Sequence, residues 1–302
     1  MAKEKLRVHR ANRIKLTLGD KVYQIVICTV VGLITVMCLF PLLYVIGMSM
    51  TSEGELLQRN YFVIIPWHPT ILAYTQILRT PDFFNSVYIS FARAVLGCAA
   101  SLVMTVPGGY IMAKHDLPCR KIIMMFFIIT MLIGGGLIPD YLLRKDLGLL
   151  DTFWVYIIPS FGGTFNMLII KIFVENIPSD IIESADLDGA TELQKLRHIA
   201  IPLLVPTLCA LGLFAVVGHW NEWFSAMVYV KDQKLFPVQF VIRNLMVKTT
   251  TPDYSNQMPM QRVTNDNVKF ASVVIAVIPV LVVYPFLQKY FIYGVYTGSV
   301  KG

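Results

Sequence analysis

Six carboxylates lie within 18 positions of a chain that is otherwise strongly apolar: Glu175, Asp180, Glu183, Asp186, Asp188 and Glu192. A charged side chain such as Asp costs about 2.5–3.5 kcal/mol at the centre of a bilayer, so this acidic segment is not expected inside a membrane. A short amphipathic helix of this kind can dock a cytosolic partner, with its apolar stripe in a groove and its acidic face toward basic residues or water. The alternative is a solvated loop between helices, and composition does not separate the two.

The acidic segment carries the signals of two short helices. A first helix is expected to begin at Pro178, Ser179 and Asp180 and to end at Gly189, with apolar residues at helical spacing between them. Thr191 and Gln194 have capping-box spacing and open a second helix that runs into an apolar stretch at Pro202. The sequence therefore predicts a helix, a glycine turn and a second helix over residues 178–202.

A second group of polar and aromatic residues follows in the stretch HWNEW: Trp220, Asn221, Glu222 and Trp223. Tryptophan rings offer faces on which pyranose rings can stack, and Asn and Glu offer hydrogen-bonding groups where polarity is costly unless it lines a cavity. This indicates a candidate substrate pathway. An aromatic belt at the membrane interface explains the tryptophans equally well.

Motifs for catalysis and for bound cofactors are missing from the sequence. It contains no GxxxxGK[ST] phosphate loop, no GxSxG, no HExxH and no CxxC pair. The five cysteines look like small packing residues, so no disulfide framework and no zinc site are implied. We therefore expect a chain that is not an enzyme and needs neither metal nor cofactor.

The composition places these residues in a membrane protein. The chain has 302 residues, of which 56% are hydrophobic and 15% are charged, and its mean hydropathy is +0.62. Soluble domains carry about 25% charged residues. Six stretches without Asp, Glu, Lys or Arg approach or exceed the length that crosses a bilayer: 22–52, 94–113, 122–139, 152–170, 198–221 and 270–288. The expected fold is an all-α membrane protein with six transmembrane helices.

Charge asymmetry predicts the topology. Seven of the residues between 1 and 21 are Lys or Arg, which by the positive-inside rule places the N-terminus in the cytoplasm. Alternation of the six spans then makes both termini and the 178–202 segment cytoplasmic. We expect a basic tail at 1–21 that contacts membrane lipid, and a six-helix domain at 22–302. Nucleic-acid binding by the tail is disfavoured by the apolar run that follows it.

The acidic segment resembles the EAA loop of bacterial ABC-importer permeases, whose form is EAA-x3-G-x9-I-x-LP. The resemblance implies that the coupling residues of this loop are Glu183, Ser184, Ala185, Asp188, Gly189, Ala190, Ile199 and Pro202. Ser184 stands where the family usually has Ala, and Ile201 where Leu is usual; the spacing is intact. With HWNEWF, the NSVYIS of residues 85–90 and the terminal VKG, the chain is similar to carbohydrate-importer permeases of the maltose-transporter type, in a Gram-positive branch for complex oligosaccharides.

This resemblance implies an ABC type I importer permease fold with a cytoplasmic coupling helix. It implies a multi-pass subunit of the cytoplasmic membrane that carries oligosaccharides and forms a heterodimer with a second related permease. Two separate ATP-binding subunits would drive it through the EAA-type loop, and an extracellular solute-binding protein, lipid-anchored or soluble, would deliver the substrate. The alternatives are an ABC permease for a non-sugar solute such as peptides, and a proton-coupled secondary transporter, for which only Glu222 supplies an intramembrane carboxylate.

Overall fold

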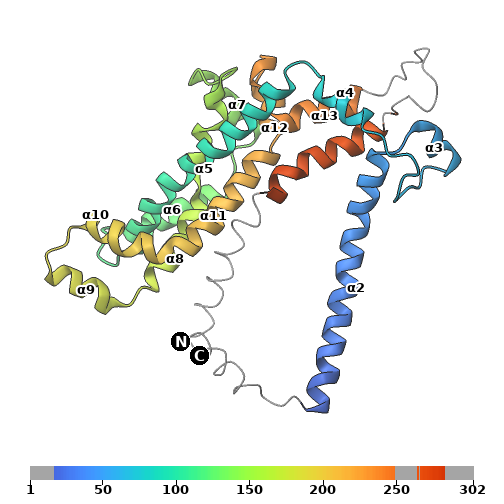
Figure 1. The fold of residues 1–302 in the computed structure, drawn as a ribbon. Helices are drawn as coiled ribbons and strands as arrows, with labels where there is room; N and C mark the ends of the chain where they lie inside the picture. The colour runs from blue at the N-terminus through green and yellow to red at the C-terminus, as the bar shows by residue number, and fades with distance from the viewer. Residues whose placement is uncertain (1–16, 249–263, 265, 283–302) are drawn as a thin grey trace, which may run out of the picture.

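The computed structural model describes residues 17–248, 264 and 266–282, and these residues form helices and connecting turns without a β-strand (Figure 1). The first helix, α2 (Leu18–Ser49), begins with a capping box formed by Thr17 and Asp20. It stands apart from the other helices in Figure 1 and is exposed along most of its length. Only its C-terminal turn is buried, where Met48 packs with Leu56 and Val63.

A long central helix, α5 (Phe83–Ala113), packs along α8 (Thr164–Glu175) and α11 (Ile201–Asn221). Small residues make the close approach possible, because a Cβ added at Gly97 would lie 2.3 Å from Nε2 of His219. The packing of α5, α8 and α11 is apolar over Val106, Ile170 and Leu204. This three-helix body supports the polar groups described below.

Shorter helices lie between and after these long ones. Between α2 and α5 lie α3 (Glu53–Gln58) and α4 (Leu72–Leu78). Between α5 and α8 lie α6 (Arg120–Leu132), α7 (Leu137–Asp146) and two 3-10 turns, η1 (Phe153–Tyr156) and η2 (Ile158–Gly162). The helices that follow α8 are α9 (Ser179–Leu187), α10 (Glu192–Lys195), η3 (Leu196–Ala200), α12 (Phe224–Tyr229), η4 (Gln233–Leu235) and α13 (Val238–Lys248), with residues 266–282 also helical.

The apolar helices agree with the prediction of a membrane protein. The number of spans can be compared only over the described residues. Among the described residues, four helices are long and apolar enough to cross a membrane, or up to five if the pair α6 and α7 is one span. That pair is bent by 110° at Ile133–Gly136, within the stretch 122–139 that was expected to form one span. Part of the sixth predicted stretch, residues 283–288, lies outside the described residues. Six spans stay a prediction.

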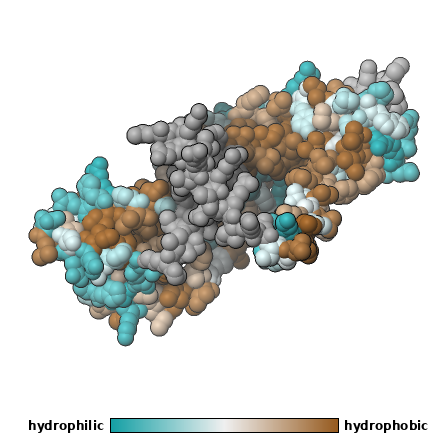
Figure 2. All heavy atoms as spheres, turned by 60° about the horizontal axis from the view of Figure 1, so that its bottom comes forward, coloured by the Kyte–Doolittle hydropathy of each residue, from teal (hydrophilic) through white to brown (hydrophobic). Residues whose placement is uncertain are grey.

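The two ends of the bundle differ from its middle. We call the end that carries α9 and α10 the α9 end, and the opposite end, with α4, α7, α12 and α13, the α12 end (Figure 1). Figure 2 shows hydrophobic residues over much of the visible surface between the two ends, and hydrophilic residues gathered at the ends. This distribution is the one expected for helices in a bilayer, with polar loops at the two membrane surfaces.

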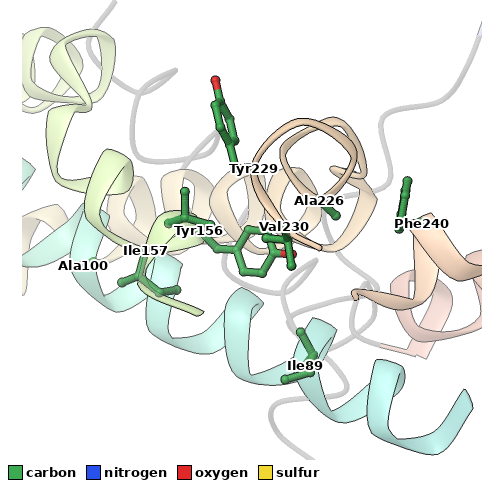
Figure 3. Packing of buried hydrophobic residues seen from close by; sticks show 9 residues of the cluster. Ile89, Ala100, Tyr156, Ile157, Ala226, Tyr229, Val230 and Phe240 are labelled. Atoms are coloured by element: carbon green, nitrogen blue, oxygen red, sulfur yellow. The ribbon is translucent and has the colours of Figure 1, made fainter. Parts of the chain in front are cut away.

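At the α12 end, the 3-10 turn η1 packs against α5 and α12. Val155, Tyr156 and Ile157 form a buried cluster with Ala226 and Tyr229, and Figure 3 shows Tyr156 lying between the α5 ribbon and α12. Asp151 orders the loop that follows α12. Its carboxylate accepts hydrogen bonds from the backbone N–H groups of Lys231 and Asp232, both 2.8 Å long. These two bonds also keep the pKa of Asp151 below its usual value.

The segment between α2 and α4 is built around a buried carboxylate. Glu55 accepts hydrogen bonds from the Trp67 backbone N–H at 2.8 Å and from the Arg59 guanidinium at 3.1 Å. Burial opposes ionisation of Glu55, but these hydrogen bonds outweigh it and hold the pKa of the carboxyl below its usual value. The segment after residue 60 is thus an ordered turn whose backbone is organised by an ionised side chain.

Candidate functional site

The predicted helix, glycine turn and second helix over 178–202 are confirmed. The first helix, α9, begins directly after Pro178, and Gly189 has a φ of +73°, a conformation that side-chain-bearing residues seldom adopt. The turn closes with a 2.9 Å hydrogen bond from the Ala190 N–H to the Ala185 carbonyl. Gln194 accepts a 2.7 Å bond from the Thr191 N–H in the expected capping box. We call residues 179–195 the hairpin.

The hairpin presents apolar side chains to the outside. No residue of α9 is buried, and Leu187 beside the turn is 90% exposed. Leu193 in α10 is 72% exposed, and Ile181 is also exposed. Glu183, Ser184 and Asp188 are exposed as well, whereas Ala185 and Ala190 are half-buried. The apolar stripe expected from sequence divides, because Leu196 and Ala200 turn inward to the core while Leu193 remains outside.

A π-helical turn joins the hairpin to α11. Residues Leu196–Ala200 form it, and the Ile201 N–H bonds to the Leu196 carbonyl, five residues back. Pro202 has no N–H to donate to the carbonyl four residues before it, so a regular α-helical ladder would already be interrupted here. Ile199, the other residue of the predicted motif at this joint, is half-buried. The second helix and the following span are therefore continuous, with a local widening between them.

Ion pairs tie the hairpin to the end of α5. Lys195 is 5% exposed and pairs with Asp186 across the hairpin and with Glu192 at 2.9 Å. Glu192 in turn pairs with Lys114 and accepts a 2.9 Å hydrogen bond from the Tyr110 hydroxyl. Tyr110 lies in the last turn of α5, and Lys114 caps that helix. Asp186 and Glu192, two of the six clustered carboxylates, are therefore structural partners of lysines.

A cavity of about 370 Å³ lies between the hairpin, the end of α5 and the end of α8. Its lining includes Ile182, Glu183 and Asp186 from α9 and His115, Asp116 and Val174 from the body. The side of α9 that faces the body is therefore not packed against it. Close by, Arg120 pairs with Glu175 and joins α6 to α8 without touching the hairpin.

A buried arginine joins α5 to the break between α11 and α12. Arg93 is 3% exposed; it pairs with the Glu222 carboxylate and donates a 3.0 Å hydrogen bond to the Glu222 carbonyl. Its guanidinium lies 4.4 Å from the centre of the Tyr156 ring. Glu222 also accepts a 2.8 Å bond from the N–H of Ser225, in the first turn of α12. The Arg93 side chain is thus buried and paired with Glu222.

The other residues of the predicted pathway have different surroundings. Trp220 is 7% exposed, and its Nε1–H donates a 3.0 Å hydrogen bond to the Ala276 carbonyl. Asn221 is exposed and accepts a 3.3 Å bond from Gln239. Trp223 is half-buried with the guanidinium of Arg243 3.2 Å from its ring centre. Trp220 thus packs inside the protein, while Asn221 and Trp223 reach its surface.

Two residues that contact Asn221 and Trp223, Gln239 and Arg243, were not predicted from the sequence. Gln239 and Arg243 lie four residues apart on α13, so they occupy one face of that helix. The sequence signal was one cation and two amides within an otherwise apolar stretch over residues 235–247. Among the described residues, no cluster of three or more His, Cys, Asp or Glu side chains is arranged to hold a metal ion.

The sequence matches a known family over residues 101–295, described as the binding-protein-dependent transport system inner membrane component. It is 39% identical to protein LplC of Bacillus subtilis strain 168, with 90% of this chain and 91% of that protein covered. It is 33% identical to the polygalacturonan/rhamnogalacturonan transport system permease protein YtcP of the same organism, with 94% and 99% covered.

Solved structures agree in fold. A chain of a bacterial ABC transporter involved in the import of the acidic polysaccharide alginate matches with a TM-score of 0.80 at 29% sequence identity, covering 92% of this chain and 100% of that chain. A chain of a bacterial alginate ABC transporter in complex with an alginate pentasaccharide-bound periplasmic protein matches at 15% identity and a TM-score of 0.53, which supports the fold alone.

Proposed function

This chain belongs to the family of binding-protein-dependent transport system inner membrane components, and from that premise we propose that it is the permease subunit of an ATP-driven importer of oligosaccharides. The observation that carries the proposal is the full-length match to the alginate importer chain together with the helix-turn-helix hairpin at one end of the bundle. The hairpin is where an ABC permease needs a docking element. The non-sugar and proton-coupled alternatives lack a comparable observation.

The partners follow from the same proposal. The chain has no phosphate loop, so ATP is bound by separate ATPase subunits. A second related permease completes the pathway, and an extracellular solute-binding protein delivers the sugar. We infer that the α9 end faces the cytoplasm and the α12 end the outside, because the N-terminal residues are rich in Lys and Arg.

The hairpin docks the ATPase. Leu187 and Leu193 supply exposed apolar side chains that suit a groove, and Glu183 supplies a charge at its rim. Gly189 sets the angle between α9 and α10. When the ATPase subunits close on nucleotide, α9 moves with them, and the continuous α10, η3 and α11 transmit that motion toward Trp220 and Glu222.

The sugar pathway passes the surface formed by Asn221, Trp223, Gln239 and Arg243. The exposed part of the Trp223 ring suits a pyranose ring, and the two amides suit hydroxyl groups. The Arg243 guanidinium is a fixed positive charge that suits the carboxylate of an acidic sugar. Trp220 and Glu222 support this surface from inside the protein. Trp220 donates a hydrogen bond to the Ala276 carbonyl, and Glu222 pairs with Arg93.

The function is tested by deleting the gene for this chain in its host and measuring the uptake of labelled solutes. We expect uptake of one class of labelled oligosaccharide to be lost while peptide uptake is unchanged, because a single permease serves one binding protein. Uptake in the intact host should be blocked by vanadate and should survive dissipation of the proton gradient when ATP is maintained. Protonophore-sensitive uptake at constant ATP would favour the secondary transporter, and loss of peptide uptake would favour a peptide permease.

The pathway is tested with Asn221→Ala and Arg243→Gln. Each is expected to lower oligosaccharide uptake by about fivefold to thirtyfold, the equivalent of about 1–2 kcal/mol for one lost contact to sugar. Both variants should retain the wild-type amount of bound ATPase, since neither touches the hairpin. Trp220→Ala is not a clean test, because removal of a buried indole destabilises the protein by about 3–5 kcal/mol. Normal uptake in both surface variants would remove them from the pathway.

A further inference from the structure

We propose that Lys195 and Glu192 form an electrostatic link through which α5 moves together with the hairpin. This inference rests on the proposed function, in which the hairpin is the element that the ATPase displaces. It adds a second route for that displacement. The first route is covalent and runs along α10 and α11, whereas the second runs through side chains into a different helix.

The hairpin depends on these side chains for its position. None of the residues of α9 is buried, and the cavity of about 370 Å³ separates part of α9 from α5 and α8. Within the described residues, the polar contact that holds α9 to α10, besides the turn itself, is the Asp186–Lys195 ion pair. Without it, α9 would be attached only through its two chain ends and weak contacts.

Lys195 is suited to a fixed rather than a transient link. Its side chain is 6% exposed and lines the cavity together with Asp186 and Glu192. Both carboxylates pair with its ammonium group, and a charge on a side chain this little exposed is costly to leave without a partner. Rotation of α9 away from α10 would expose or strand that charge. The two helices are therefore expected to move as one unit.

Glu192 extends the link to α5. One of its carboxylate oxygens accepts from Lys195 at 2.9 Å, and the other accepts from the Tyr110 hydroxyl at 2.9 Å and pairs with Lys114. A single carboxylate thus bridges the hairpin and the last turn of α5. Any displacement of α10 pulls on Tyr110 and Lys114 as well as on α11.

Through α5 the link reaches the opposite end of the molecule. Arg93, on the same helix, lies about 30 Å from Lys114 by the rise of an α-helix. It pairs with Glu222 at the break that follows α11. The hairpin is therefore connected to Glu222 twice, along α11 by the backbone and along α5 by the two ion-paired ends. A continuous helix with contacts at both ends is able to carry a displacement between them.

The test uses the complete transporter in lipid nanodiscs with Lys195→Gln. We expect ATP hydrolysis stimulated by the substrate-loaded binding protein to fall about tenfold, within the usual range of coupling effects, while the ATPase subunits remain bound. Arg197→Gln is the matched control, because Arg197 is an exposed cation two residues along the same helical segment. It should retain stimulation within about twofold, as surface substitutions usually do.

A covalent replacement separates the link from a general effect on folding. In a background without the native cysteines, Asp186→Cys with Lys195→Cys is expected to lose stimulation when reduced and to regain at least half of it when a short bifunctional thiol reagent joins the pair. Wild-type stimulation in Lys195→Gln, or no recovery after cross-linking, would overturn the link. If the wild-type complex itself shows no stimulation, the proposed function fails instead.

Discussion

Valine in place of Gly189 is expected to reduce both uptake and substrate-stimulated ATP hydrolysis by about tenfold to a hundredfold. The φ of +73° at this position costs a β-branched residue about 1–3 kcal/mol, so the turn would open or rotate. Nothing lies within 4 Å of a Cβ added there, so the effect is conformational and not a collision. The angle of α9 changes, and the docked geometry is lost.

Gly189→Asn is the control for this prediction. Asparagine adopts the left-handed conformation more readily than other residues with side chains, and there is space for it. We expect this variant to keep most of the activity and all of the bound ATPase. Uptake and hydrolysis are measured in proteoliposomes, and ATPase binding by co-purification. Equal activity of the valine and asparagine variants would show that the turn geometry does not matter.

Arg93→Met is expected to lower the amount and thermal stability of the folded protein. The substitution removes the positively charged partner of Glu222 and leaves its carboxylate with the hydrogen bond from the Ser225 N–H. Breaking a buried pair costs about 3–5 kcal/mol, and we expect about 3 kcal/mol here because the Glu222 side chain is 32% exposed. Arg93→Lys should rescue only in part, since one ammonium cannot serve the carboxylate, the Glu222 carbonyl and the Tyr156 ring together.

The double variant Arg93→Met with Glu222→Gln tests the cause. Neutralising both members removes the stranded charge, so the double variant is expected to be more stable than Arg93→Met alone. Melting temperature of the purified complex in detergent is the measurement. If the double variant is less stable than the single one, the carboxylate is held by other groups and the Arg93 effect comes from packing. Uptake is then compared only among variants with normal stability.

Local features of the hairpin could be predicted from the sequence because short-range interactions determine them. Pro178, Gly189 and the capping box of Thr191 and Gln194 act within a few residues, so their effects do not depend on the rest of the fold. Composition alone did not separate a docking helix from a solvated loop for this segment. The resemblance to the EAA loop favoured the docking helix.

Long-range pairing could not be predicted in the same way. Arg93 and Glu222 are 129 residues apart, and each was seen only as a single charge in an apolar run. Burial of Trp220 depends on the Ala276 carbonyl, in a part of the chain that local patterns do not connect to it. The size of the 110° bend between α6 and α7 could not be predicted from counts of uncharged residues, because hydropathy gives the length of a span and not its direction.

The π-helical turn at Leu196–Ala200 has a consequence for how this joint tolerates insertions and deletions. A π turn holds one residue more than an α turn, so it sets the rotational phase between α10 and α11. Loss of a single residue here would turn the face of α10 by about 100° relative to α11. Glu192 would then point away from Tyr110 and Lys114, although every residue type in the joint was kept. The number of residues between Gly189 and Pro202 is thus a structural quantity in its own right.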